Sequence, residues 1–446
     1  MTLDPVLLAR IQFAMTVGFH FIFPSITIGL AWLLVLMEYR GLRTGDETYA
    51  KMATLFSKLF AITFVIGVAT GITMEFQFGT NWSQYARFVG DIFGAPLAAE
   101  AILSFFLEST FLGLYLFGRG RISKRLQRFS VLMVACGATL SAFWILVANS
   151  WQQTPAGYVF NPSTGRAELA SFAHAVFNPS MIIRFCHTMD AALICGCFFM
   201  GGIAAYLLLK NKEDVVARKA LRLAMIVGLI TSTLELFPFG HEHARQVGNQ
   251  QPEKLAAFEG LLEGGPYAPI TLFGIPTNDR IIGAVRAPWL LSMLVGFKPS
   301  TVVHGLNEYP PDQRPPIFLP FIGFHAMVGL GMLFIALTAF GLFQLWRGRL
   351  HEDKWFLRIL VPAIPLPVIA CEAGWVVAEV GRQPWIVYHL LKTRDAVSVS
   401  VSAGEILFSL VLFGAVYALL FVLYIYLVCR TAKQGFEPAS QREVAE

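Results

Sequence analysis

Charged residues are scarce in this sequence. Only 14% of its 446 residues are Asp, Glu, Lys or Arg, whereas 56% are apolar; a soluble domain has about 25% charged residues. The polar residues are too few to cover the surface of one water-soluble globule of this size. The composition therefore excludes a soluble enzyme, a disordered chain and a collagen-like repeat, and it predicts a protein with several membrane spans.

Two other features are also missing. The net charge is +5, but no basic stripe is interleaved with aromatic residues on a polar domain, which argues against nucleic-acid binding. The six cysteines form no C-x-x-C pair and lie in or beside apolar runs, where cysteine packs as a small hydrophobic residue. The RFCH run at His187 lacks the first cysteine of a covalent c-type haem motif, which excludes that attachment.

What the sequence does contain is long apolar runs. About 20 apolar residues cross the roughly 30 Å hydrocarbon core of a bilayer. The first run is too long for a signal-peptide core and has no convincing cleavage site, so we expect it to be a mature helix. The sequence predicts an all-α polytopic membrane bundle of about nine transmembrane helices. The runs lie near residues 11–37, 59–78, 94–117, 129–149, 181–209, 223–240, 318–345, 359–380 and 404–429.

The distribution of lysine and arginine predicts the orientation. One set of connecting segments, including the C-terminal tail, holds 21 cations in 75 residues, and the other set holds 13 in 160 residues. Because cytoplasmic loops are enriched in these residues, we expect the N-terminus outside and the C-terminus in the cytoplasm. The predicted organisation is six helices in 1–240, a long outer loop in 241–317, and three helices with the tail in 318–446. That loop is either functional or a simple outer cap.

Ionisable residues occur at or within the predicted spans. Each costs at least ~2.5–3.5 kcal/mol in hydrocarbon, so each needs a partner or a function. A membrane histidine usually bonds to a neighbouring helix and a methionine usually packs, but the two together are also the axial ligands of a low-spin haem. These residues are His20, His187, His325, Glu75, Glu100, Glu108, Glu235, Glu372, Glu379 and Glu405.

Depth and spacing suggest sites for some of them. At 1.5 Å per residue, His187 and Met327 would both lie about 9–14 Å below the outer surface, where one haem could bridge them. Glu100 and Glu108 would be about 12 Å apart along one helix, a stagger that suits proton transfer through water. Arg382 follows Glu379 by one turn, which fits a simple ion pair or an iron-ligating carboxylate beside a cation that holds a haem propionate.

Nine sequence blocks resemble subunit I of the cytochrome bd-type quinol oxidases, over essentially the whole chain. Because they occur in the family's order, an accidental match is excluded in practice. The blocks are GFHFIFPSITIG, GVATGITMEFQFGTNWSQY, GDIFGAPLAAEAILSFFLEST, LSAFWILVANSWQQTP, RFCHTMD, QPEKLAAFEG, TLFGIP, FHAMVGLG and EAGWVVAEVGRQPW.

The resemblance implies the haem ligands. His187 and Met327 match the ligands of the low-spin haem b558. His20 and Glu379 match the axial ligands of the two high-spin haems, b595 and d, and the resemblance leaves open which haem takes which ligand. Trp375 matches a tryptophan that lies among the haems.

The resemblance also implies the remaining site residues and the reaction. Glu100 and Glu108 match acidic residues of proton delivery, Lys254 and Glu259 match residues of the quinol loop, and Arg382 matches the arginine of GRQPW. Ubiquinol or menaquinol would be oxidised at the outer face, and O₂ would be reduced to water with protons from the cytoplasm, which separates charge without a pump. The implied partners are a second large membrane subunit, or subunit II, and a small single-helix subunit, in the bacterial inner membrane.

The sequence departs from well-known family members in three places. His325 stands in FHAM where those members have Arg in an FRIM run, and the quinol loop is of the short type. GHEHARQV, which contains His241 and His243, resembles the cyanide-insensitive branch, whose members often lack spectral haem d. A further haem b could therefore replace haem d at the O₂ site.

Two other functions compete with this interpretation. A secondary transporter or proton channel would also carry buried carboxylates, but it does not explain His187 with Met327, and no inverted repeat is visible. A di-haem b electron conduit without O₂ chemistry is the alternative among redox proteins. A reduced-minus-oxidised spectrum distinguishes them, since a transporter has no haem and a conduit has low-spin haem alone.

Overall fold

Long apolar helices make up most of the fold. The structure is a computed structural model that describes residues 4–277 and 280–436. Within these ranges, eight helical segments are long and apolar enough to cross a membrane. They are Pro5–Thr44 (α1), Thr48–Thr80 (α2), Ser83–Phe117 (α3, η1 and α4), Lys124–Gln153 (α5), Met181–Lys210 (α7), Val215–Gln250 (α8, η2 and α9), Phe318–Trp346 (α12) and Ala403–Gln434 (α15).

Two of these segments contain a π-helical turn. The third segment is α3 (Ser83–Ala99), the π-helix η1 (Glu100–Phe105) and α4 (Phe106–Phe117). The sixth is α8 (Val215–Leu234), the π-helix η2 (Glu235–Gly240) and α9 (His241–Gln250). Each π-turn begins at a carboxylate, and such turns often mark functional sites. The sixth helix also continues to Gln250, beyond the end expected near residue 240.

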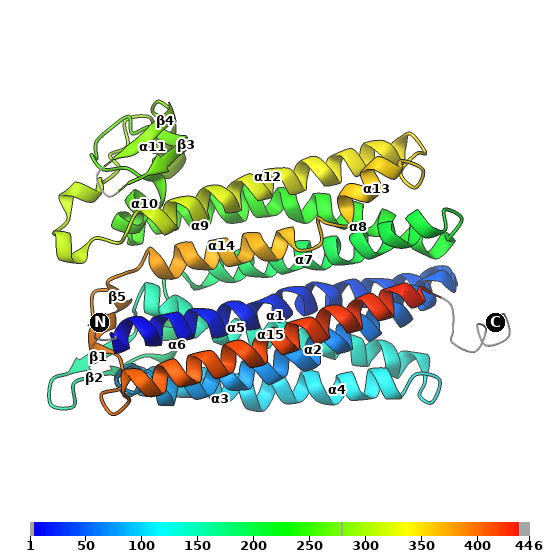
Figure 1. The fold of residues 1–446 in the computed structure, drawn as a ribbon, viewed down its shortest axis with the longest axis horizontal. Coiled ribbons are helices and arrows are strands. Elements are labelled where there is room, and N and C mark those ends of the chain that lie inside the picture. The colour runs from blue at the N-terminus through cyan, green and yellow to red at the C-terminus, as the bar shows by residue number, and fades with distance from the viewer. Residues whose placement is uncertain (1–3, 278–279, 437–446) are drawn as a thin grey trace.

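The eighth expected span is interrupted. Instead of one helix over 359–380, the chain forms α13 (Lys354–Leu360) and α14 (Leu366–Val380), joined by a turn that contains Pro362 and Pro365. Proline donates no backbone hydrogen bond and its ring clashes with the preceding turn, so the helix breaks there. α14 still runs within the bundle beside α7 and α12 (Figure 1).

The two sets of connecting segments lie at opposite ends of the bundle. The cation-rich loops that join α4 to α5, α7 to α8 and α12 to α13 are at the right-hand end of Figure 1, and the strands are at the left-hand end. α1 begins at the left-hand end and α15 ends at the right-hand end. This arrangement agrees with the expected orientation, in which the left-hand end faces outward.

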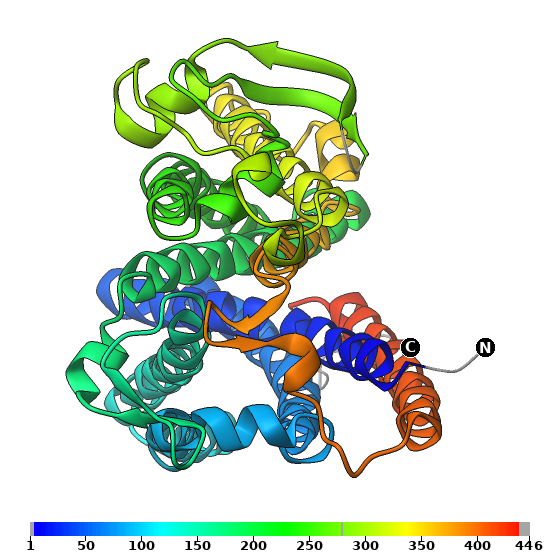
Figure 2. The same cartoon turned by 90° about the vertical axis from the view of Figure 1, so that its left-hand side faces the viewer.

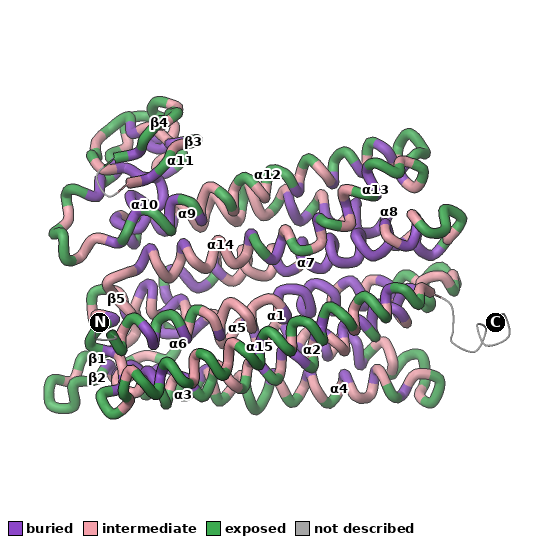
Figure 3. Tube along the Cα trace, viewed as in Figure 1, coloured by how far each residue is buried: buried purple, intermediate pink, exposed green. Residues whose placement is uncertain are grey.

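α1 and α7 cross with their backbones in contact. A Cβ atom on Gly196 would lie 2.6 Å from the carbonyl carbon of Gly29, and one on Gly29 would collide with the carbonyl oxygen of Ala192. Only glycine permits so close an approach. The main hydrophobic core surrounds the halves of these helices that are nearer the cation-rich loops, where α7 is mostly buried. The helices α12 and α15 are much less buried than α7 (Figure 3).

Short elements cover the outer end, which faces the viewer in Figure 2. The three antiparallel pairs are β1 with β2, β3 with β4, and β5 with β6. The elements are β1 (Tyr158–Asn161), β2 (Arg166–Leu169), α6 (Phe172–Val176), α10 (Pro252–Glu259), β3 (Ile270–Pro276), β4 (Ile281–Ala287), α11 (Leu290–Gly296), η3 (Leu306–Glu308), η4 (Pro311–Gln313), β5 (Trp385–Val387), β6 (Leu391–Lys392) and η5 (Thr393–Asp395).

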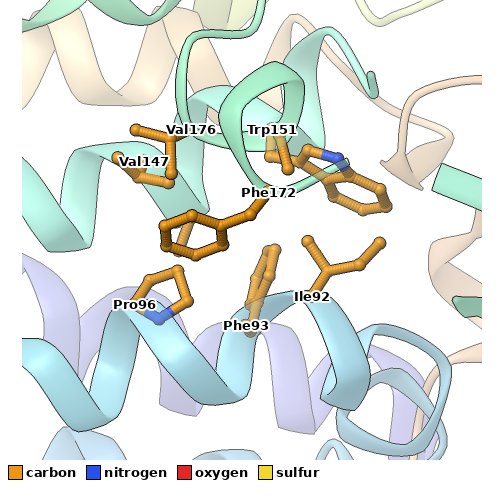
Figure 4. Close-up of a pocket in the computed structure, with 9 residues that line it drawn as sticks. Ile92, Phe93, Pro96, Val147, Trp151, Phe172 and Val176 are labelled. Carbon is orange, nitrogen blue, oxygen red and sulfur yellow. The ribbon is translucent and has the colours of Figure 1, made fainter. Parts of the chain in front are cut away.

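Apolar packing fixes the outer end of α5. Phe93 and Pro96 of α3 face Trp151 of α5 and Phe172 of α6 in Figure 4, and the gap between them has no room for a water molecule. The Phe93 and Trp151 rings meet edge to face at 5.7 Å, and the Trp151 indole donates a hydrogen bond of 2.8 Å to the carbonyl of Ala156. Such buried aromatic contacts hold the last turn of α5 in place.

Candidate functional site

A cavity of about 1380 Å³ runs through the bundle between its outer and central parts. A site for one small molecule typically has roughly 300–1,000 Å³, so this cavity has room for more than one such group. All ten site residues expected from the sequence line it. They are His20, Glu100, Glu108, His187, Lys254, Glu259, Met327, Trp375, Glu379 and Arg382.

Glycines face two of the expected haem ligands. A Cβ atom on Gly374 would lie 2.7 Å from the sulfur of Met327, and one on Gly240 would lie 3.7 Å from Cε1 of His187. The His187 Nδ1 atom is 3.0 Å from Oε1 of Glu235, at an angle too oblique for a hydrogen bond. The Met327 thioether and the His187 imidazole therefore line the cavity, with Nε2 of the ring and the sulfur available as ligands.

His20 is held by residues of α2. Its Nδ1 atom lies 3.0 Å from the Thr70 hydroxyl, and the ring packs against Gly71, where a Cβ atom would lie 3.0 Å from Cε1. A hydrogen bond at Nδ1 leaves Nε2 free to bind a metal, which is how proteins usually orient a metal-binding histidine. α1 stays helical through Pro24, four residues after His20.

The Glu379 carboxylate is surrounded by donors. Asn149 donates to it at 2.9 Å and Gln153 at 3.2 Å, and Arg382 forms an ion pair with its other oxygen. The ion pair suggested by the sequence is therefore present. Arg382 is 4% exposed and also donates to the Gln152 side chain at 2.7 Å.

Sequence reasoning assigned no role to the amides of α5. Gln153 accepts a hydrogen bond from the Lys254 ammonium group and donates one to Glu379, so it links the outer α10 helix to α14. Gln152 connects Arg382 to the Tyr85 hydroxyl. The available signal was a run of polar residues, NSWQQ, at the outer end of an apolar helix.

Three buried cations meet beside these amides. Burial holds the pKa of Lys254 well below its ordinary value, and the nearby positive charges of Arg184 and Arg382 lower it further. The Nε atoms of both arginines have no hydrogen-bond partner among the described residues. Buried like charges are costly unless an anion joins them. The two propionates of a haem are such anions, so the cluster fits a haem at this end of the cavity.

Glu100 is the first residue of the π-turn, and Glu108 lies beyond the turn, in α4. The Ser141 hydroxyl donates to Glu100 at 2.6 Å, and Glu108 is 6% exposed, with its backbone packed against Gly137. The expectation of a regular α-helical stagger between the two carboxylates is wrong, because Glu100–Phe105 is π-helical. The wider turn changes the direction in which Glu100 points relative to Glu108.

The expected quinol-loop residues lie on α10. Glu259 is its last residue and is 3% exposed, and Gly260 ends the helix with a positive φ of 65°. Burial raises the pKa of Glu259 to about 8, although the backbone N–H of Thr271 opposes this rise. Lys254, in the first turn of α10, and Glu259, at its end, both line the cavity, so one short helix presents a cation and a carboxyl group to it.

The histidines that distinguish this chain are also close to the cavity. His325 places Nε2 at 2.7 Å from the carbonyl oxygen of Thr271 and Nδ1 at 2.8 Å from that of Phe321. His241 and His243 lie in helix α9 rather than in a loop, and the ring of His243 is 5.0 Å from that of His187. His325 therefore joins β3 to α12 close to Met327.

Comparison with known proteins identifies the family. The family model "Cytochrome bd terminal oxidase subunit I" matches residues 8–436. The chain is 42% identical to cytochrome bd ubiquinol oxidase subunit 1 of Bacillus subtilis, covering 99% of this chain and 96% of that one. It is 36% identical to cytochrome bd-II ubiquinol oxidase subunit 1 of Escherichia coli, covering 97% of each chain.

A solved structure agrees. The bd oxidase of Geobacillus thermodenitrificans superposes with a TM-score of 0.90 at 32% identity, over 97% of this chain and 99% of that one. Together with the apolar helices, these relatives indicate a multi-pass protein of the bacterial inner membrane, and they exclude the competing transporter interpretation. The chain belongs to the cytochrome bd terminal oxidase subunit I family.

Proposed function

We propose that the ten residues that line the central cavity perform the quinol oxidation and O₂ reduction of this terminal oxidase subunit. The single observation that carries the proposal is that one cavity gathers all ten, from segments spread between residues 20 and 382. Membership of the family implies haem cofactors, a quinol substrate, O₂ and a second subunit. The haem types b558, b595 and d, or a further haem b in place of d, belong to the proposal, as does a small single-helix subunit.

The proposed haem sites follow from the donors that face the cavity. His187 and Met327 would hold the low-spin haem, and His20 and Glu379 would each hold one high-spin haem. When bound, the haems supply the electron carriers and the iron that binds O₂. Arg184, Arg382 and Lys254 would neutralise propionates, because these three buried cations lie close together, which lowers the pKa of Lys254, while Glu379 is ion-paired with Arg382.

The quinol would be oxidised at the outer end of the cavity. The Glu259 carboxyl group would accept a quinol proton, and Lys254 would orient the quinol oxygen or the carboxylate. Both side chains line the cavity and lie on the outer side of the bundle. In this proposal, residues 241–317 are the quinol-binding segment between the helices of 1–240 and those of 318–446.

Protons for O₂ reduction would arrive from the cytoplasmic side. Glu108 lies closer to that end than Glu100 on the third segment, and Ser141 already donates to Glu100. Glu108 would therefore pass a proton to Glu100, which lies nearer the proposed high-spin haems. Protons leave at one face and enter at the other, so charge is separated without a pump.

The low-spin haem site gives the test of the proposal. Replacing Met327→Leu removes a thioether ligand but keeps the volume and apolar character of the side chain. We expect the low-spin haem band of the reduced-minus-oxidised spectrum to be lost selectively, and His187→Ala to lose it with poorer assembly. Met200→Leu is the matched control, since Met200 is fully buried in α7 and does not line the cavity. An unchanged spectrum and midpoint potential in Met327→Leu would remove this residue from the site.

A further inference from the structure

The β3–β4 hairpin and α11 expose an unusual number of large apolar side chains for an extramembrane segment. Phe273 and Ile275 of β3 are 67% and 60% exposed. The hairpin pairs only β3 with β4, so its two strands have no further sheet neighbour among the described residues. The other exposed apolar residues are Leu272, Ile282, Val285, Trp289, Met293, Leu294 and Phe297. Patches of this kind mark a surface that contacts something apolar.

This surface continues onto α12, a helix with exposed apolar side chains. The hairpin contacts α12, whose outer turns expose Phe318, Leu319 and Ile322. Figure 1 shows the hairpin and α11 alongside the outer part of α12, and Figure 2 shows them at the perimeter of the bundle. Exposed cations, Arg280 and Arg286, flank the apolar strand residues, as expected beside lipid phosphates. The outer leaflet of the membrane is therefore the occupant that fits the position and chemistry of this surface.

The same surface reaches the cavity. Three leucines are exposed on this surface and also line the cavity: Leu272, Leu294 and Leu319. An apolar edge therefore connects the outer surface of the hairpin with the interior of the cavity. Thr271, which precedes Leu272, contacts two residues of the site. Its N–H faces Glu259, and its carbonyl oxygen lies 2.7 Å from Nε2 of His325. The base of the hairpin is thus attached to the candidate quinol residue, and its outer part faces the membrane.

We propose that the β3–β4 hairpin and α11 insert into the outer leaflet and form, with the start of α12, the lateral entrance through which a lipid-dissolved quinol reaches Glu259. Leu272, Leu294 and Leu319 contact the isoprenoid tail while the quinol head approaches Glu259. The inference rests on the proposed quinol site, because it specifies the route and the part of the substrate that this surface recognises.

Two quinols test the entrance in the complete oxidase reconstituted into proteoliposomes. Leu272→Asp should raise the KM for a long-tailed isoprenoid quinol about tenfold, which corresponds to about 1.4 kcal/mol, with kcat unchanged. The KM for a tail-less, water-soluble quinol should stay the same. Val159→Asp is the matched control, because Val159 is exposed on β1 of the β1–β2 hairpin and does not line the cavity. The proposal would be overturned if KM rose equally for both quinols, or if it rose for neither.

Fluorescence tests the insertion without a charged variant. Trp289 is the N-cap residue that directly precedes α11, and it is 49% exposed. In vesicles of phospholipids brominated near the headgroup, the native protein should lose a fraction of emission that Trp289→Phe does not lose. If the native protein and Trp289→Phe lose the same amount of emission, α11 lies outside the bilayer. That result is expected if another protein covers this face. If Glu259→Gln leaves turnover of both quinols intact, the proposed quinol site fails, whatever the quenching result.

Discussion

The acid limb of the pH profile of quinol oxidation, in which kcat/KM rises with pH, should report the ionisation of Glu259. Burial raises the pKa of this carboxyl group to about 8. A proton acceptor must be deprotonated, and the raised pKa leaves about a tenth of the groups in that form at pH 7 and about a hundredth at pH 6. We therefore expect kcat/KM for quinol to rise about tenfold per pH unit up to about pH 8 and then to level off. A carboxyl group with an ordinary pKa would give a flat profile over this range.

The substitution Glu259→Gln removes the titrating group while keeping the shape of the side chain. We expect low quinol turnover that no longer rises between pH 6 and pH 8, measured as O₂ consumption by the complete oxidase. Reduction of the haems by dithionite should remain normal, which shows that the haem sites are intact. The matched control is Glu263→Gln, four residues further along. Glu263 is exposed and bonds to Asn307, so this variant should keep the acid limb.

The result that would refute this reasoning is an unchanged acid limb in Glu259→Gln. The titrating group would then lie elsewhere, and Lys254, whose pKa is lowered by burial, would be the next candidate. A second informative outcome is a flat profile in the native enzyme. That would mean that Glu259 is ionised throughout the range and that burial does not control its proton.

Three further predictions concern the haem and proton sites. Glu108→Leu should slow O₂ reduction in stopped-flow experiments while low-spin haem reduction by quinol stays fast; normal proton uptake from the inside would place the route elsewhere, for example in the partner subunit. Gly374→Ala should shift the low-spin haem spectrum and midpoint potential with little loss of thermal stability, because the new methyl group displaces the flexible Met327 thioether; an unchanged potential would argue against ligation by Met327. Gly71→Ala should perturb the high-spin haem bands but not the low-spin band, since its Cβ would lie 3.0 Å from the His20 ring; a change confined to the low-spin band would contradict the assignment of His20.

Much of the helical architecture could be predicted from the sequence. Apolar runs of about 20 residues have few stable structures in a bilayer other than helices, so eight spans were found from length and composition. The break at Pro362 and Pro365 has an equally local cause, but an apolar run containing proline also fits a kinked, continuous helix. The π-turns at Glu100 and Glu235 leave no comparable trace, because hydrophobic periodicity is uninformative in a segment that is apolar on all sides.

The contacts within the site depended on the tertiary arrangement. The bridge by Gln153 between Lys254 and Glu379 joins three segments that are far apart in the chain. Nothing in the local sequence specifies that α5, α10 and α14 converge. The cluster that Lys254 forms with Arg184 and Arg382 was hidden for the same reason, since each residue alone fits a helix-end cation. Resemblance to the family indicated which residues to examine, but only the fold showed what each one contacts.

The contact between Gly29 and Gly196 has a mechanical consequence. His20 and His187 each precede the glycine of their own helix by nine residues, which is about 13.5 Å along a helix axis. α1 and α7 both begin at the same end of the bundle and cross at these glycines. The two histidines therefore lie at equal distances from the crossing point, on the same side of it. A side chain at either glycine would push the two helices apart or change their crossing angle, and so change the distance between the two histidines. The spacing of the two proposed haem ligands is thereby set by the absence of side chains at Gly29 and Gly196.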